Sequence, residues 1–266
     1  QYDNMNAFFR TNGYDEVFSQ ENYPADKVVN SFGVQDDFLY DYAIPVLNQR
    51  AATGQPFFAT LLSISNHPPY VIPPFFHPKT SEPETQIVEY ADWALRQFFE
   101  EARKQPWFDN TIFVLEGDHG KLVGDAECEL PESYNHIPLM IYSSRIQPEE
   151  KTTFGGQVDI QPTILGLLNI DYLQNNFGVD LLKEERPCMF YTADNMVVGR
   201  NDTLLYLYNY ETQQELTYDI GNGKLNAVPM DDSFLPLKEY SFSMLQSAEF
   251  LVKHGKTLNS IPFTQQ

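Results

Sequence analysis

The sequence predicts an α/β fold in which a mostly parallel sheet is flanked by helices and followed by a small antiparallel β subregion. Three short runs are apolar throughout, which is typical of strands that are buried on both faces. Segments with apolar residues at helical spacing alternate with these runs, as they do in parallel sheets. Residues 189–219 instead alternate aromatic and polar side chains around turn signals such as Asn201-Asp202, which predicts antiparallel hairpins.

Residues 1–110 contain two expected helices and the first of the three apolar runs. A helix is expected over residues 36–48, and a strand is expected over residues 56–65 before a proline-rich loop. Ser81 and Glu84 have the spacing of a capping box, and Pro83 suits a first helical turn. The helix that follows has apolar residues at helical spacing, namely Ile87, Tyr90, Ala91, Ala94, Leu95, Phe98 and Ala102.

The rest of the chain continues the same alternation. The other two apolar runs predict strands over residues 111–115 and 137–142. A helix is expected over residues 157–168, beginning near Asp159, and an amphipathic helix over residues 237–254 closes the chain.

The charge balance restricts the possible partners. The 266 residues include 17 Lys and Arg against 37 Asp and Glu, so the net charge is −20. Such acidity argues against nucleic acid and against anionic lipid surfaces, which both bind basic faces. An anionic small substrate stays compatible if a metal ion reverses the local field. The hydrophobic content of 42% excludes a disordered chain.

The cysteines and the start of the chain indicate less about fold and function. Cys128 and Cys188 could form one disulfide, but two unpaired thiols are the preferred interpretation. No apolar run approaches the length of a membrane span. The chain opens on Gln1-Tyr2-Asp3, without Met or a leader pattern, as if it were cut from something longer.

Asp118 and His119 form the sharpest candidate site. They directly follow the apolar run of residues 111–115, and Gly117 and Gly120 flank them. In open α/β sheets, ligands bind beyond the carboxyl ends of strands, where a carboxylate and an imidazole side by side could share one divalent cation. The alternative is an ordinary loop Asp and His that are hydrogen-bonded to the backbone.

The other histidines differ in their settings. His67 lies just past the first apolar run, residues 56–65, where it could donate to an anionic group or be an ordinary turn histidine. His136 stands before a strand, and Lys121 could offer a point charge or be solvated. His77 and His254 are assigned to the surface or to packing.

These segments resemble a known family. Glu116-Gly117-Asp118-His119-Gly120 resembles the metal-binding segment of the sulfatase-like branch of the alkaline phosphatase superfamily. Other segments resemble lipoteichoic acid synthases and related phosphoglycerol transferases, and the ordered resemblance runs from about Asp3 to Asp219. These segments are residues 12–18, residues 62–70 with Ser65-Asn66-His67, Tyr90-Ala91-Asp92, residues 134–139 and residues 158–163.

The resemblance implies a mechanism. A threonine nucleophile, activated by one divalent metal ion, takes phosphoglycerol or phosphoethanolamine from a lipid and passes it to a glycan acceptor. Mn²⁺ or Mg²⁺ is the expected ion, with Zn²⁺ or Ca²⁺ as alternatives. Asp118 and His119 match two metal ligands, while His67 matches a histidine that binds the phosphoryl group. His136 resembles the active-site histidine of phosphoethanolamine transferases. The expected location is the extracytoplasmic face of a bacterial membrane, with anchoring by transmembrane helices that this chain lacks.

The chain also departs from the family pattern. The nucleophile and the first carboxylate ligand are expected upstream, so no catalytic nucleophile is assigned here, and neither cysteine has the sulfatase Cys-x-Pro-x-Arg context. We therefore expect the C-terminal portion of a catalytic domain, inactive alone, with a partial core over residues 1–185 and hairpins and a helix over residues 186–266. The alternatives are an arylsulfatase-type ester hydrolase, another metal-dependent phosphohydrolase, or a non-catalytic binding or structural domain that keeps the fold.

Overall fold

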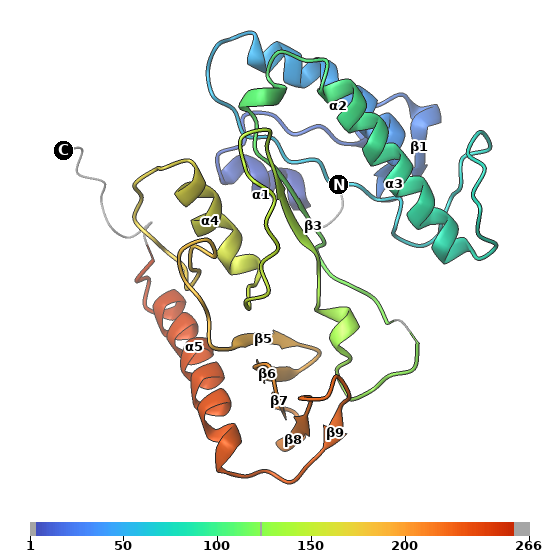
Figure 1. Ribbon diagram of the computed structural model, residues 1–266. Coiled ribbons are helices and arrows are strands. Elements are labelled where there is room, and N and C mark those ends of the chain that lie inside the picture. Colours follow the sequence, from blue (N-terminus) through green and yellow to red (C-terminus); the bar gives the residue numbers. More distant parts are fainter. Residues whose placement is uncertain (1–3, 123, 258–266) are drawn as a thin grey trace. The chain divides into compact units, whose positions relative to one another are not determined.

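The structure is a computed structural model that describes residues 4–122 and 124–257 (Figure 1). Gln1-Tyr2-Asp3, where the family resemblance begins, and residues 258–266, which end the expected C-terminal subregion, lie outside the described residues. The chain forms two compact units, the first over Gln1–Val114 and Ile141–Ile146, the second over Leu115–Met140 and Gln147–Gln266. The expected division near residue 185 stays a prediction.

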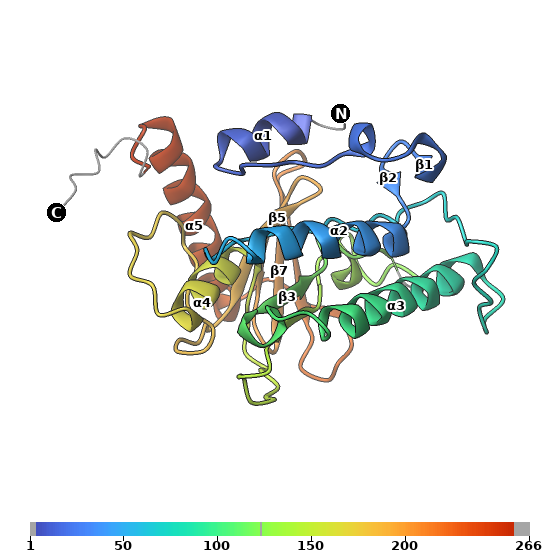
Figure 2. The ribbon, with the colours of Figure 1, turned by 90° about the horizontal axis from the view of Figure 1, so that it is seen from above.

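The first unit is built around two long helices. Helix α2 (Asp36–Ala51) and helix α3 (Pro83–Ala102) pack side by side, as Figure 2 shows. Short elements precede them, and η4 follows α3. These are α1 (Met5–Thr11), η2 (Gln20–Asn22), η3 (Ala25–Lys27), β1 (Val28–Asn30), β2 (Gly33–Val34) and η4 (Phe108–Asn110).

The predicted long helix is confirmed, with a different start. Pro83 occupies its first turn, but the N-cap residue is Glu82, so Ser81 and Glu84 do not form the expected capping box. The pyrrolidine ring favours the first helical position, which places Glu84 one residue too early to reach the cap. Its buried face joins α2 in a core of Ala43, Leu47, Phe98, Ala102, Trp107 and Phe108.

The strand expected over residues 56–65 is not formed. None of the described strands pairs with this segment, and its apolar side chains include Phe58, which is 79% exposed, and Leu62, which is 54% exposed. A strand requires a neighbouring strand to which its backbone N–H and C=O groups can hydrogen-bond. Apolar composition alone does not supply that partner.

The other two apolar runs do form strands. Strands β3 (Phe113–Glu116) and β4 (Leu139–Tyr142) make a two-stranded sheet, and the boundary between the units passes through both strands. The helix expected over residues 157–168 begins with a short 3₁₀ turn, η6 (Gln157–Asp159), and continues as α4 (Ile160–Leu167).

The predicted antiparallel subregion is confirmed in the second unit. Its five strands pair in chain order, and Val198 lies opposite Leu207 in the register of β6 and β7. Helix α5 (Leu235–Lys253) packs against β5 and β6 (Figure 1). The strands are β5 (Met189–Ala193), β6 (Met196–Arg200), β7 (Leu204–Asn209), β8 (Gln214–Asp219) and β9 (Asn226–Ala227), and two 3₁₀ turns, η5 (Glu132–Tyr134) and η7 (Asp232–Phe234), complete the unit.

The α/β class is thus confirmed. The expectation of two unpaired thiols is confirmed as well. Cys128 and Cys188 are both free. The Cys128 thiol donates to the carbonyl oxygen of Leu130 at 3.0 Å, and burial raises the pKa of both thiols. Each cysteine therefore has a packing role in the second unit.

A buried ion pair joins distant parts of the second unit. The Arg186 guanidinium donates to Asp159 at 2.5 Å, and their side chains are only 4% and 0% exposed. The same guanidinium donates to the Phe177 carbonyl and to the Tyr240 hydroxyl on α5. Asp159 also accepts from the backbone N–H groups of Gly156 and Val179, at 2.8 Å each. Burial by itself would lower the pKa of Arg186, but the hydrogen bonds and charge of Asp159 outweigh it and raise that pKa.

A buried carboxylate has a similar place in the first unit. Asp36 opens α2 and is 2% exposed. One of its oxygens accepts from the backbone N–H groups of Ile64 and Ser65, at 3.1 and 3.0 Å. The Ser65 hydroxyl in turn donates to Gln35 at 2.9 Å. Asp36 therefore fixes the segment that leads to His67.

The Asp159→Ala variant should lower the free energy of unfolding by about 3–5 kcal/mol, because it leaves the Arg186 guanidinium buried and unpaired. The measurement is urea unfolding followed by far-ultraviolet circular dichroism. The control, Asp92→Ala, removes the exposed Asp92–Arg96 pair and should change stability by less than about 0.5 kcal/mol. Equal losses in the two variants would show that the buried pair is not an anchor.

The Asp36→Asn variant tests the buried carboxylate by pH. Burial raises the pKa of Asp36, only partly offset by its hydrogen bonds to Ser65 and Ile64. Its contribution to stability is therefore full below the unfolded pKa and is lost as the pH rises through the folded value. Wild type should lose stability relative to Asp36→Asn as the pH rises from about 4. Tryptophan fluorescence reports this unit, since Trp93 and Trp107 both lie in it; a difference that does not change with pH would contradict the assignment.

Candidate functional site

The loop that follows β3 carries Asp118 and His119. The Asp118 carboxylate accepts from the backbone N–H of His119 at 2.9 Å, and its other oxygen lies 3.9 Å from Nε2 of His119. The ring atom Nδ1 of His119 lies 2.7 Å from the carbonyl oxygen of Gly120. Because a carbonyl oxygen can only accept, Nδ1 carries the proton of the neutral ring and Nε2 keeps its lone pair. Metal-binding histidines commonly have this arrangement.

Two other segments hold this loop in place. The backbone N–H of Gly120 donates to the Tyr134 carbonyl oxygen at 2.8 Å. The side-chain amide of Gln157 donates to the carbonyl oxygens of Asp118 and Gly117, at 3.1 and 3.3 Å. A Cβ atom on Gly120 would lie 2.0 Å from the Ser133 carbonyl oxygen, so this close approach requires glycine. Three segments that lie far apart in the sequence thus meet in the second unit.

The donor chemistry at this loop fits part of a divalent metal site. The side chains of Asp118 and His119 are 78% and 68% exposed, and both can direct a donor atom to one ion. Over residues 4–122 and 124–257, no group of three or more His, Cys, Asp or Glu side chains could hold a metal. Catalytic metals usually have three protein ligands, so the pair supplies a share of such a site.

A further carboxylate stands beside this pair. Burial raises the pKa of Glu116, the last residue of β3, and the negative charge of Asp118 raises it further. A cation bound at Asp118 would counter that repulsion.

His136 lies in the same unit, at the end of the segment that supports the loop. Its backbone N–H donates to the Glu132 carbonyl oxygen at 2.8 Å, and its side chain is exposed. Beside it, the Nδ2 atom of Asn135 is buried and has no hydrogen-bond partner among the described residues. A buried amide without a partner is uncommon in native proteins.

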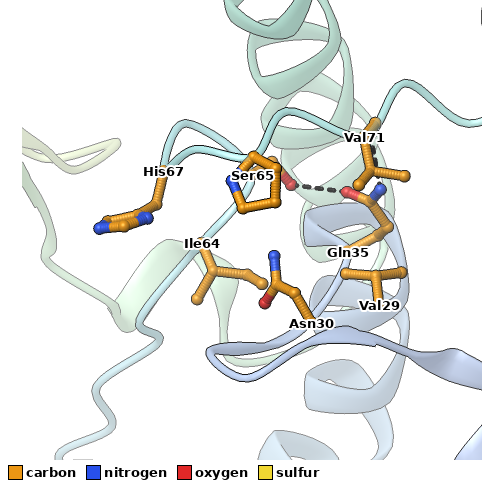
Figure 3. A pocket seen from close by; sticks show the side chains of 8 residues that line it. Val29, Asn30, Gln35, Ile64, Ser65, His67 and Val71 are labelled. Atoms are coloured by element: carbon orange, nitrogen blue, oxygen red, sulfur yellow. Dashed lines mark hydrogen bonds between the residues drawn. The ribbon is translucent and has the colours of Figure 1, made fainter.

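His67 belongs to the first unit. Its backbone N–H donates to Ile64 at 2.9 Å, and its Nδ1 atom lies 2.7 Å from the Pro68 carbonyl oxygen. Its ring packs on Phe32, with the centroids 4.0 Å apart. His67 also lines a small pocket, shown in Figure 3, with Val29, Asn30, Gln35, Ile64, Ser65, Pro69 and Val71.

The structure thus groups Asp118, His119 and His136 in one unit and places His67 in the other. Sequence reasoning did not identify Gln157, Asn135 or Phe32 as parts of these surroundings. Gln157 directly precedes one of the family-like segments, and Asn135 lies inside another. Their places in the sequence could therefore have indicated that both residues lie near the candidate site. No local pattern pointed to Phe32. The ring of His254 stacks on Phe250, with the centroids 4.3 Å apart, which agrees with a packing role.

Comparisons with known proteins place this arrangement in a family. The sulfatase family model matches residues 1–170. Lipoteichoic acid synthase 1 of Bacillus subtilis is 27% identical over 243 residues, which cover 83% of this chain and 36% of that protein. Lipoteichoic acid synthase of Staphylococcus saprophyticus is 26% identical, over 68% of this chain and 31% of that protein. The chain therefore spans about a third of the length of these relatives.

Solved structures agree with that placement. An alkaline phosphatase superfamily protein from Vibrio parahaemolyticus matches with a TM-score of 0.79 and 27% identity, over 93% of this chain and 62% of that chain. A phosphonate monoester hydrolase from Silicibacter pomeroyi has the same fold, with a TM-score of 0.59 at 18% identity over 91% of this chain and 67% of that chain. In the described residues, no helix has both the length and the hydropathy of a membrane span. The chain belongs to the sulfatase family of enzymes, in the alkaline phosphatase superfamily, and is similar to lipoteichoic acid synthases.

Proposed function

We propose that this chain is the C-terminal part of a metal-dependent transferase that moves phosphoglycerol from a lipid-linked donor to a glycan acceptor. The observation that carries the proposal is the pair of Asp118 and His119 at the end of β3, with the lone pair of Nε2 left available by the contact of Nδ1 with Gly120. The similarity to lipoteichoic acid synthases supports the choice of phosphoglycerol over sulfate.

The residues of this chain have distinct roles in this proposal. Asp118 and His119 hold one divalent ion, Mn²⁺ or Mg²⁺ by preference, with Zn²⁺ or Ca²⁺ as alternatives. When bound, the ion would neutralise phosphoryl charge and favour the ionised form of a nucleophilic hydroxyl. His67 and His136 bind the transferred group. Gln157 holds the loop in position through its hydrogen bonds to the carbonyl oxygens of Asp118 and Gly117. The threonine nucleophile is proposed to lie N-terminal to residue 1.

The proposed setting follows from the same similarity. The enzyme would act at the extracytoplasmic face of a bacterial membrane, where lipid-linked donors and glycans meet. The net charge of −20 fits a small anionic ester as the substrate only with a cation present, and it disfavours nucleic acid. Cleavage of sulfate esters is the second candidate, because the family model that matches is that of the sulfatases.

Metal binding can be tested on this chain by paramagnetic broadening. Substoichiometric Mn²⁺ should broaden the His119 ring signals in a proton–carbon NMR spectrum more than those of His77 and His254. The Asp118→Asn variant should weaken the effect about tenfold or more, because a metal ligand is lost. Asp125→Asn, a control in the same acidic part of the chain, should leave it unchanged. Broadening that survives Asp118→Ala would remove Asp118 from the site.

Activity should depend on the pair in protein that also carries the nucleophile segment. Lipid phosphoglycerol donors, other phosphodiesters and sulfate esters are compared with and without Mn²⁺. We expect Mn²⁺-dependent release from the lipid donor, reduced about 100-fold or more in His119→Gln. Turnover of sulfate esters alone would support the second candidate, and no turnover of any ester would support a non-catalytic domain.

A further inference from the structure

We propose that Phe32 is a positioning residue that orients the imidazole of His67, and that Asn30 fixes the turn presenting the Phe32 ring. The proposal rests on the proposed function only for the ligand that His67 receives, a phosphoryl group. It assigns a role to a turn between two short strands, β1 and β2, that the mechanism above leaves unused.

The turn is built to hold Phe32. The side-chain oxygen of Asn30 accepts from the backbone N–H groups of Phe32 and Gly33, at 2.9 and 3.3 Å. Such a bond from an Asn side chain to a backbone two residues on is a common way of stabilising a tight turn. Gly33 has φ at +146°, a conformation that favours glycine, and the next residue, Val34, pairs with Val28 of β1.

Two contacts then fix the imidazole of His67. Its face packs on the Phe32 ring with the centroids 4.0 Å apart and the planes at 40°, and its Nδ1 atom lies 2.7 Å from the Pro68 carbonyl oxygen. Nδ1 must carry a proton to make that bond, so Nε2 is the ring atom left for a ligand. Figure 3 shows the imidazole pointing away from the other labelled side chains.

The backbone beneath the ring is fixed independently. Asp36 accepts from the N–H groups of Ile64 and Ser65, and the Gln35 amide spans Ser65 and the Val71 carbonyl (Figure 3). Rotation of the imidazole is the main freedom that this network leaves. The Phe32 ring limits that rotation. Replacing Phe32 should therefore change the orientation of the His67 imidazole and leave the fold intact.

The test reads the tautomer of His67 directly. Nitrogen-15 NMR of the ring at alkaline pH should show the Nδ1–H form in wild type, with the signal assigned through His67→Gln. Phe32→Leu and Asn30→Ala should shift His67 toward a mixture of tautomers. Phe32→Trp and Asn30→Asp, which restore the ring and the acceptor, should return it. Phe75→Leu, which removes an aromatic ring elsewhere in the first unit, is the matched control. An unchanged tautomer in folded Phe32→Leu would overturn the proposal.

Binding of glycerol phosphate separates this proposal from the proposed function. The chain is titrated with glycerol 1-phosphate and, in parallel, with inorganic phosphate, by NMR. Phe32→Leu should weaken binding of both about three- to tenfold, and Phe32→Trp should restore it. A wild-type chain that binds neither anion would count against the phosphoryl role of His67, while the tautomer would still decide the role of Phe32. Full binding by Phe32→Leu would contradict the positioning role.

Discussion

The buried pair of Asp159 and Arg186 is the interaction on which the second unit depends. It connects the start of α4, the backbone near residues 177–179 and, through Tyr240, helix α5. An ion pair in such a place contributes little net energy over apolar packing, yet breaking it leaves a buried charge. Gln157, two residues before Asp159, donates to the carbonyl oxygens of Asp118 and Gly117 in the loop that follows β3. The same buried pair therefore fixes both the packing of the unit and the position of the candidate site.

A buried carboxylate also holds a backbone segment in place in the first unit. Asp36 accepts backbone N–H bonds from Ile64 and Ser65, just ahead of His67. A carboxylate has several acceptor positions, so one side chain can fix a loop that has no ladder of its own. Each unit therefore has a buried carboxylate that accepts backbone N–H groups, and each has an exposed imidazole on a loop, His67 in the first unit and His119 in the second. The exposed groups can then meet a charged ligand without the loops having to reorganise, which favours binding.

The exposure of Asp118 and His119 also limits the affinity that the pair alone can have for a cation. Two exposed donors in a chain of net charge −20 attract cations, but water competes for the same positions. A third ligand would add affinity and fix the geometry. The coverage of about a third of each curated relative fits a chain that supplies part of such a site.

Patterns along the chain were enough to predict several helices, the hairpins and the motifs. Helical spacing predicted α3 and α5, aromatic alternation predicted the hairpins from β5 to β8, and the strand before Asp118 followed from its apolar run. The three-dimensional structure was needed to show that residues 56–65 do not form a strand and that α3 starts after Glu82. It also showed that Gln157, Gly120 and Tyr134 meet at one loop. Phe32 and His67 likewise meet only in three dimensions. Periodicity records which face of an element is buried, whereas pairing and loop contacts join residues far apart in the chain and leave no local pattern.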